Sequence, residues 1–379
     1  MEMKKFMYLL IIVVAVTSLV FLGIGCKEEA VEEVQEAVEE AVEEVEEAVE
    51  EMVDEADLPV LNIGMSVNIG AVANNYMIEN GIDKENGFII NQIIFPTGVA
   101  INEGIAANEV DMATTGSGGL FAINNLDVEW ITDFQLQSNG IGIFVRGDSP
   151  IATVKGVNPD YPEVYGDPDT VRGATILATF GTIGEFQVLK WLGIIGVDPS
   201  EVSITQMQYP DVFTAMQAEQ ADVGNLIPTA SYAAPEMGWV EVGSMASLDI
   251  AFYDGFLLNV NTVNDSNGAD KREGLIKYLK VLYEDITPMF NNTEGMKAEW
   301  SKKFFDSQAI ETNPDWLDFQ ASTWTYWAAD DYTSGEHILG EWLRPFVEFY
   351  VTAEKLPADF MDTFDASLND EYLKEALGY

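Results

Sequence analysis

The chain contains few cysteine, histidine and basic residues for its length. Its 379 residues include one Cys, one His and 18 Lys and Arg, against 64 Asp and Glu, which gives a formal net charge of −46. A single cysteine excludes an internal disulfide, and a single histidine provides no zinc-ligand spacing. So acidic a protein repels nucleic-acid phosphates and anionic lipids. We therefore expect no metal site, no cofactor and no nucleic-acid partner.

Long apolar runs are also scarce, and the one that reaches the length of a membrane span lies at the start of the chain. Two lysines precede an apolar stretch over residues 6–21, and small residues follow up to Gly25. This order is typical of a secretory signal peptide, here residues 1–25. Cys26 comes next, in a position that resembles the lipobox of bacterial lipoproteins, although Gly23 stands where leucine is commonest. We expect lipidation at Cys26 and an extracytoplasmic, membrane-anchored protein; an uncleaved N-terminal anchor and a fortuitous cysteine are the alternatives.

Residues 26–57 have too simple a composition for a folded domain. Residues 27–57 contain 16 Asp and Glu against one Lys, and the pattern VEEVQEAVEEA repeats after 11 residues. A period of about 3.67 residues is helical and favours straight or slightly right-handed winding. Glutamates four residues apart repel one another. We expect a charged, partly helical stalk that holds the body away from the membrane; a short coiled coil with a partner is the alternative.

Residues 58–379 are too many for one compact core and suit two lobes. Strand and helix patterns alternate there, which indicates mostly parallel sheets covered by helices. We expect a first lobe over 58–146, a second over 147–253, and a return to the first lobe with C-terminal helices over 254–379. The Trp- and Tyr-rich region 284–350 should form helices around the first lobe. The expected strands are residues 60–66, 88–95, 110–115, 130–136, 141–146, 174–179, 202–207, 221–226 and 251–260.

Small polar residues and glycines follow most of the expected strands. Gly116-Ser117-Gly118-Gly119 opens a helix after one of them, and the turn at 179–182 does the same in the second lobe. Carboxyl ends of parallel strands meet at one edge, where open α/β sheets hold ligands. Each segment could also be an ordinary βα loop. The expected ligand-binding residues are Ser66, Asn68, Thr97, Thr114, Thr115, Ser117, Gln137, Asn139, Thr179, Phe180, Thr182, Tyr209, Asn225 and Asp254.

The segments expected to form the cleft contain no lysine or arginine; they are residues 66–74, 95–98, 114–118, 137–139, 179–182, 209–210, 225–229 and 253–254. A bare inorganic anion would then depend on hydroxyls and helix N-termini, each end contributing roughly 0.3–1 kcal/mol and up to about 2 when partly buried. Micromolar binding needs about 8 kcal/mol. We therefore expect a small organic solute, neutral or zwitterionic, such as an aromatic heterocycle. Asp254 could receive an amino group from it or be a solvated hinge residue, the expected hinges being 140–146 and 254–259.

The order of several short motifs resembles the nitrate/sulfonate/bicarbonate-type substrate-binding proteins of ABC importers, a family that also binds taurine and a thiamine pyrimidine precursor. The motifs are Leu61-Asn62-Ile63-Gly64, Ile105 to Asp111 before Thr115-Gly116, Asp148-Ser149-Pro150-Ile151, Leu192-Gly193 through Asp198-Pro199-Ser200-Glu201-Val202, Ala215-Met216-Gln217-Ala218 before Ala221-Asp222, and the tail Phe364-Asp365-Ala366-Ser367. The resemblance implies an α/β, two-lobed periplasmic-binding-protein type II fold, with hinge-linked mixed sheets and a C-terminal helical extension. It implies a monomer that delivers a solute to an ABC transporter permease.

Two other functions remain open at this point. A pyrimidine synthase in fungi shares the fold, but that resemblance depends on histidine and clustered cysteines. Here the one histidine, His337, follows the polar turn Ser334-Gly335-Glu336 and is most simply a surface residue. We therefore expect no enzyme activity. A ligand-sensing subunit of a receptor is the third possibility, and the sequence does not separate it from an importer subunit.

Overall fold

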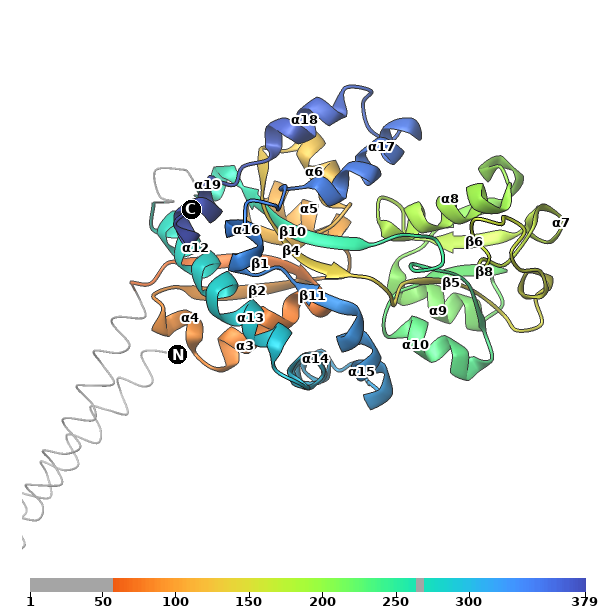
Figure 1. Ribbon diagram of the computed structural model, residues 1–379, viewed down its shortest axis with the longest axis horizontal. Helices are drawn as coiled ribbons and strands as arrows, with labels where there is room; N and C mark the ends of the chain where they lie inside the picture. The colour runs from red at the N-terminus through yellow and green to blue at the C-terminus, as the bar shows by residue number, and fades with distance from the viewer. Residues whose placement is uncertain (1–56, 264–268) are drawn as a thin grey trace, which may run out of the picture. The chain divides into compact units, whose positions relative to one another are not determined.

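The computed structural model describes residues 57–263 and 269–379. The expected signal peptide, Cys26 and the acidic stalk up to residue 56 lie outside them. Residues 59–379 form one compact unit, which holds two separate β-sheets (Figure 1). Within the described part of the chain, no helix is both long and apolar enough to cross a lipid bilayer.

The first sheet has six strands and is mixed. Its strands are β1 (Val60–Ser66), β2 (Ile89–Phe95), β3 (Met112–Thr115), β4 (Val128–Gln137), β10 (Phe252–Asn259) and β11 (Trp324–Tyr326), in the order β11-β4-β10-β3-β1-β2. Strands β1, β2 and β3 run parallel, and β10 lies antiparallel to both β3 and β4. All four residues of β3 are buried, as expected for a central strand covered on both faces.

The second sheet has five strands. They are β5 (Gly142–Val145), β6 (Thr175–Ala178), β7 (Ser203–Gln206), β8 (Val223–Leu226) and β9 (Val240–Ser244), in the order β7-β6-β8-β5-β9. Strands β6, β7 and β8 are parallel, while β5 lies antiparallel to β8 and β9. Its helices are α7 (Pro168–Val171), α8 (Ile183–Ile195), α9 (Tyr209–Gln217) and α10 (Ala230–Ala233).

Helices cover both faces of the first sheet (Figure 1). Successive residues of β10 show the alternation, because Phe256 and Leu258 belong to one apolar cluster and Leu257 to another. The first cluster includes residues of α3 (Val72–Glu79), α12 (Ala269–Val281), α13 (Thr287–Asn292), α14 (Met296–Ser307), α15 (Pro314–Thr323), α16 (Ala329–Thr333) and α19 (Glu371–Leu377), with α4 (Ile82–Glu85) and α11 (Val260–Val263) at its edge. The second includes residues of α5 (Gly98–Ala106), α6 (Gly119–Asn125), α17 (Arg344–Thr352) and α18 (Phe360–Ser367).

The second of these clusters continues into the helices of the second sheet. The Phe186 ring on α8 lies 4.5 Å from that of Phe346 and 4.8 Å from that of Phe349, both on α17. On the same side, the Tyr350 hydroxyl donates to the backbone carbonyl of Thr182 at 3.0 Å. Lys355, just after α17, forms an ion pair with the buried carboxylate of Glu185. The C-terminal region therefore contacts the second sheet as well as the first.

The expected strands occur within two residues of their predicted bounds, but the C-terminal region differs from the prediction. Trp324–Tyr326 forms strand β11, which pairs with β4, rather than part of a helix. The prediction was wrong because a β-branched residue between two aromatics suits a strand that has a partner to pair with, and that partner lies far away in the sequence. Strand β9 was not predicted at all.

The structure also corrects the position of the expected hinges. Residues 142–145 are paired on both sides within the second sheet, and residues 252–259 are paired within the first. Ladder hydrogen bonds hold both runs in place, so the segments that cross between sheets are residues 138–141 and 245–251. Gly140 in the first crossing has a φ of 105°, and a Cβ there would lie 2.6 Å from the Tyr232 hydroxyl oxygen. The crossing therefore requires glycine.

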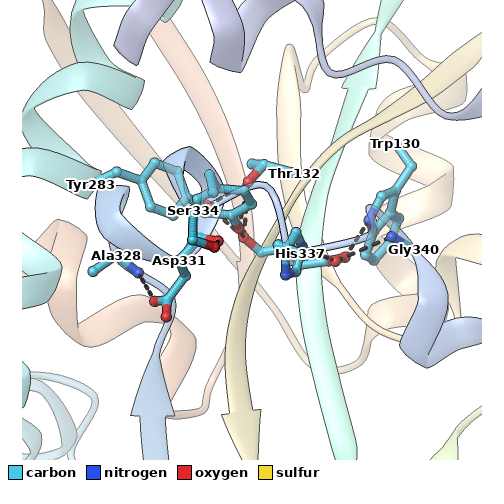
Figure 2. A network of polar contacts seen from close by, with 10 residues as sticks. Trp130, Thr132, Tyr283, Ala328, Asp331, Ser334, His337 and Gly340 are labelled. Carbon is cyan, nitrogen blue, oxygen red and sulfur yellow. Dashed lines mark hydrogen bonds and ion pairs between the residues drawn. The ribbon is translucent and has the colours of Figure 1, made fainter. Parts of the chain in front are cut away.

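His337 is not a surface residue, as the polar turn before it suggested. Its side chain is 6% exposed, and its Nε2 lies 2.8 Å from Oδ2 of the buried Asp133 (Figure 2). The same carboxylate accepts hydrogen bonds from the Trp130 indole N–H, at 2.8 Å, and from the Gly340 backbone N–H, at 3.1 Å. The prediction failed because Asp133 lies about two hundred residues earlier in the chain. His337 is part of a buried polar network that joins β4 to the C-terminal region.

Candidate functional site

A cavity of about 90 Å³ lies between the loops of the two sheets. A single buried water needs roughly 10–15 Å³ of such space, so the cavity has room for several waters or for the head of a small solute. It is lined by Ser66, Val67, Asn68, Pro96, Thr97, Gly98, Thr115, Gly116, Ser117, Gly118, Gln137, Ile141, Thr182, Ile183, Tyr209, Ile227, Pro228, Asp254, Phe305 and Gln320. None of these residues is a lysine, arginine or histidine.

The first sheet supplies its part of the lining from the carboxyl ends of β1, β2 and β3. These strands are parallel, so the loops after them lie at one edge of the sheet. Thr97 caps α5 by accepting a hydrogen bond from the Ala100 backbone N–H. A Cβ on Gly118 would lie only 3.3 Å from the backbone of Gly98. The glycine-rich turn therefore allows two loops of the lining to approach closely.

Two buried hydroxyl groups of this lining are poorly satisfied within the protein. Thr115 and Ser117 are both 2% exposed. Within the described residues, neither hydroxyl makes a hydrogen bond of good geometry. A buried polar group without a partner costs free energy, and such groups in folded proteins usually bind water, an ion or a ligand. These hydroxyls are the clearest sign that the cavity is built to receive a polar molecule.

The hydroxyl groups from the second sheet are already used within the protein. Thr182 caps α8 by accepting from the Gly184 backbone N–H at 3.1 Å, and it donates to the Thr179 carbonyl at 2.6 Å. The Tyr209 hydroxyl lies 2.6 Å from that of Thr182. Burial raises the pKa of Tyr209 to about 12, so it stays neutral. A Cβ on Gly184 would lie 2.7 Å from the Tyr209 hydroxyl oxygen, so this arrangement requires glycine.

Asp254 is the only carboxylate in the lining. It is 3% exposed, and its Oδ2 accepts a hydrogen bond from the Gln135 side-chain amide at 2.7 Å. Burial raises the pKa of Asp254 to about 7, and the hydrogen bond from Gln135 partly opposes this rise. The alternative in which Asp254 is a solvated hinge residue is therefore wrong: the residue is buried, and within β10 it pairs with Gln135 of β4.

Part of the lining was missed by the sequence analysis. Ile141 and Ile183 adjoin predicted segments, but Phe305 on α14 and Gln320 on α15 come from the C-terminal region. Phe305 is 1% exposed and Gln320 is 2% exposed. No local motif marks them, because helical apolar spacing looks the same for a core residue and for a residue that lines a cavity.

Nine of the fourteen expected ligand-binding residues come together around the cavity, and five do not. The nine are Ser66, Asn68, Thr97, Thr115, Ser117, Gln137, Thr182, Tyr209 and Asp254. The five outside its lining are Thr114, Asn139, Thr179, Phe180 and Asn225. Adjacent residues of a strand face opposite sides, so Thr114 and Thr115 could not both line it.

The remaining four of these five residues have other contacts. Thr179 donates to the Met207 carbonyl at 2.7 Å, and Asn225 donates to the Gln187 side chain at 2.7 Å. The Asn139 carbonyl accepts from Gln137 at 2.7 Å. Phe180 is 36% exposed, with the Lys355 ammonium 5.0 Å from its ring centre.

Comparison with known proteins supports the same architecture. No protein-family model matches the chain. A protein from Brachyspira hyodysenteriae described as a putative ABC transporter periplasmic binding protein is 27% identical over 321 residues, which is 85% of this chain and 90% of that protein. The periplasmic nitrate-binding protein NrtA from Synechocystis PCC 6803 superimposes with a TM-score of 0.64 at 12% identity, covering 85% of this chain and 89% of that one.

A second solved structure gives a similar result. The periplasmic aliphatic sulphonate binding protein SsuA from Escherichia coli superimposes with a TM-score of 0.56 at 15% identity, covering 79% of this chain and 94% of that one. The two-sheet α/β fold expected from the sequence is therefore confirmed. The chain has the fold of the periplasmic binding proteins and is similar over most of its length to one assigned to an ABC transporter.

Proposed function

We propose that this chain is an extracytoplasmic solute-binding protein that captures a small organic solute between its two sheets and delivers it to an ABC importer. The observation that carries this proposal is the cavity between the sheets, with the unpartnered hydroxyl of Thr115 in its wall. The relative from Brachyspira hyodysenteriae and the fold neighbours support the transport role.

The lining favours an organic solute over a bare inorganic anion. Nitrate and sulfonate are named for two of the fold neighbours, but no cationic side chain lines the cavity of this chain. Apolar contact can replace the missing charge attraction, at about 25 cal/mol for each Å² of apolar surface buried. Ile141, Ile183, Ile227 and Phe305 supply apolar surface in the lining.

We further propose that binding is not followed by chemistry. Acid–base or nucleophilic catalysis needs two or more reactive groups within hydrogen-bond reach of one another. The lining contains one carboxylate, Asp254, and neither histidine nor cysteine. His337 lies in the network around Asp133 and does not line the cavity. These residues support a binding site rather than the pyrimidine-synthase alternative.

The test of this function is a titration combined with a measurement of shape. Calorimetry with nitrate, bicarbonate, taurine, alkanesulfonates and pyrimidines should find an organic compound that binds. We propose that binding closes the cleft about residues 138–141 and 245–251, so small-angle scattering should show a more compact protein with that compound. Identical scattering curves with and without saturating ligand would rule out closure, and binding of nitrate alone would contradict the proposed solute class.

We propose that the protein works as a monomer tethered by a lipid on Cys26 through the acidic stalk. Its first lobe comprises residues 58–146 and 254–379, and its second lobe comprises residues 147–253. Acylation of the cysteine after a signal peptide would anchor the chain without a spanning helix. Cys26→Ser should release the protein from the membrane fraction or stall its processing. Wild-type protein that is soluble and carries no lipid by mass spectrometry would contradict the anchor.

A further inference from the structure

The cavity wall contains a carboxylate that has no cationic partner. Asp254 is 3% exposed, and its one hydrogen bond with the described residues uses Oδ2 and the Gln135 amide. Among the described residues it takes part in no ion pair. By contrast Asp111, directly before β3 and 1% exposed, is paired with Lys271 at 2.8 Å. Asp133, in β4 and also 1% exposed, lies 2.8 Å from His337. Asp254 therefore differs from these two buried carboxylates in having no basic side chain beside it among the described residues.

An unpaired buried carboxylate is expensive for a folded protein. A charge moved from water into a protein interior loses its hydration, and this loss is recovered only through a counter-charge and hydrogen bonds. The raised pKa of Asp254, about 7, reflects this cost. Groups with such perturbed pKa values in a cavity are frequently functional. The missing counter-charge can come from the molecule that occupies the cavity.

The groups near Asp254 are also suited to binding a positively charged group. The Gln135 side-chain oxygen is buried and has no hydrogen-bond partner among the described residues. A Cβ on Gly70 would lie 2.9 Å from the Asn68 side-chain oxygen and 3.3 Å from the Gln135 amide nitrogen, so these two amides lie together where Gly70 has no side chain. Gln135 itself is not in the cavity wall, but Asn68, Thr115 and Asp254 are, so this side of the cavity presents side-chain oxygens that can accept hydrogen bonds and no cation. Hydrogen-bond donors of a cationic group would be satisfied there.

We propose that the solute carries a positively charged nitrogen group, an ammonium or amidinium, which binds in the cavity against the carboxylate of Asp254. This inference rests on the proposed solute-binding function and specifies which solutes the site accepts. A sulfonate or carboxylate elsewhere on the same molecule is compatible with it, because a zwitterion satisfies Asp254 with one end only. A purely anionic solute is not, because its charge would lie beside a second negative charge with no cation in the lining.

The test compares compounds that differ in one group. Calorimetric titration would use three pairs in which an ammonium replaces a hydroxyl or a neutral carbon: taurine and isethionate, choline and 3,3-dimethylbutan-1-ol, and benzylammonium and benzyl alcohol. In at least one pair the cationic member should bind about tenfold or more tightly than its neutral or hydroxyl partner. Asp254→Asn should abolish that preference, because it keeps the shape and removes the charge.

A matched control is available in the same fold. Asp83 is 2% exposed, has one oxygen without a hydrogen-bond partner among the described residues, and does not line the cavity. Asp83→Asn makes the same chemical change and should leave the preference for the cationic member intact. Circular dichroism of both variants checks that each is folded. Loss of the preference in Asp83→Asn as well would mean that it does not come from contact with Asp254.

Three further results would overturn the inference. The first is a preference for the cationic member that persists in Asp254→Asn. The second is equal binding of the two members in every pair that binds. The third is that none of the six compounds binds, while nitrate, an alkanesulfonate without an amine or a neutral pyrimidine does. That result would contradict the inference but would still support the proposed solute-binding function. If no compound binds, either from these three pairs or from the panel named for the proposed function, the solute-binding function itself is contradicted, and this inference with it.

Discussion

Two threonines on opposite sides of the cavity, Thr115 and Thr182, have the same side chain and different surroundings. The Thr182 hydroxyl accepts from Gly184, donates to Thr179 and contacts Tyr209, so its hydrogen-bonding capacity is full. The Thr115 hydroxyl has no partner among the described residues, although it is only 2% exposed. The side of the cavity formed by the second sheet is therefore satisfied within the protein, whereas the side formed by the first sheet is not.

Small polar residues at the ends of strands can either support the local structure or bind a ligand, and the sequence pattern alone does not distinguish these two roles. On the second-sheet side, hydroxyls cap a helix and fix the shape of a turn. On the first-sheet side, unpartnered hydroxyls and the unpaired Asp254 cost stability and are available to a ligand. We expect the first-sheet side to determine affinity and the second-sheet side to determine stability. Three predictions test this division, from the largest expected effect to the smallest.

The largest effect should come from pH and Asp254. The folded protein holds this proton up to about pH 7, whereas the unfolded chain releases it near pH 4. Because the folded state binds more protons between these values, the contribution of Asp254 to stability falls as the pH rises from about 4 to 7. Asp254→Asn should therefore stabilise the ligand-free protein at pH 8, by at most about 4 kcal/mol, and should change little at pH 4.

The measurement is urea unfolding of wild type and variant at both pH values, without ligand. The quantity to compare is the difference between the two proteins, because other carboxylates of this acidic chain also respond to pH. Equal stability of wild type and Asp254→Asn at pH 8 would mean that the buried carboxylate does not lower the free energy of unfolding.

A smaller effect is expected from Thr182→Val, on the second-sheet side. The substitution keeps the shape and removes the hydrogen bonds to Thr179, Gly184 and Tyr209. Loss of a helix cap costs about 0.5–2 kcal/mol, and a stranded partner adds about 1 kcal/mol. Urea unfolding should show a loss of roughly 1.5–3 kcal/mol. Thr182→Ser retains the hydroxyl and should keep most of the stability, and a Thr182→Val variant as stable as wild type would contradict the division.

The smallest effect on stability should come from Thr115→Val, on the first-sheet side. Removing an unpartnered buried hydroxyl should leave the free energy of unfolding unchanged or raise it by up to about 1 kcal/mol. Affinity for the bound solute should fall by about tenfold, since one hydrogen bond of about 1.4 kcal/mol is lost. Calorimetry and urea unfolding of the same preparation give both numbers, with Thr115→Ser as the control. If the variant loses stability but keeps its affinity for the solute, Thr115 has a structural role like that of Thr182 and not a ligand-binding role.

The sequence was sufficient for much of the first-sheet side of the site. Strand periodicity followed by glycine and hydroxyl residues located Ser66, Thr97, Thr115 and Ser117, because the ends of parallel strands necessarily share an edge. The lack of lysine and arginine in these segments also held for the whole lining. These are local properties of the chain, or follow from a general rule of sheet topology.

The sequence was insufficient wherever a contact joins distant parts of the chain. Phe305 and Gln320 reach the cavity from helices about two hundred residues after the glycine-rich turn. His337 contacts the buried Asp133, and Trp324–Tyr326 forms a strand because it pairs with β4. Whether a threonine hydroxyl is free or satisfied depends equally on the tertiary structure, so Thr115 and Thr182 looked alike in the sequence.

The aromatic contact between α8 and α17 also affects how the body should respond to heat. Phe186, Phe346 and Phe349 belong to, or pack against, one apolar cluster that extends from helices of the first sheet into those of the second. Neither sheet can lose its helices without exposing part of the other's core, so the two should melt together in a single cooperative transition. A solute bound at one side of the cavity then protects the whole body, and a shift in melting temperature would report its binding wherever in the cavity it makes its contacts.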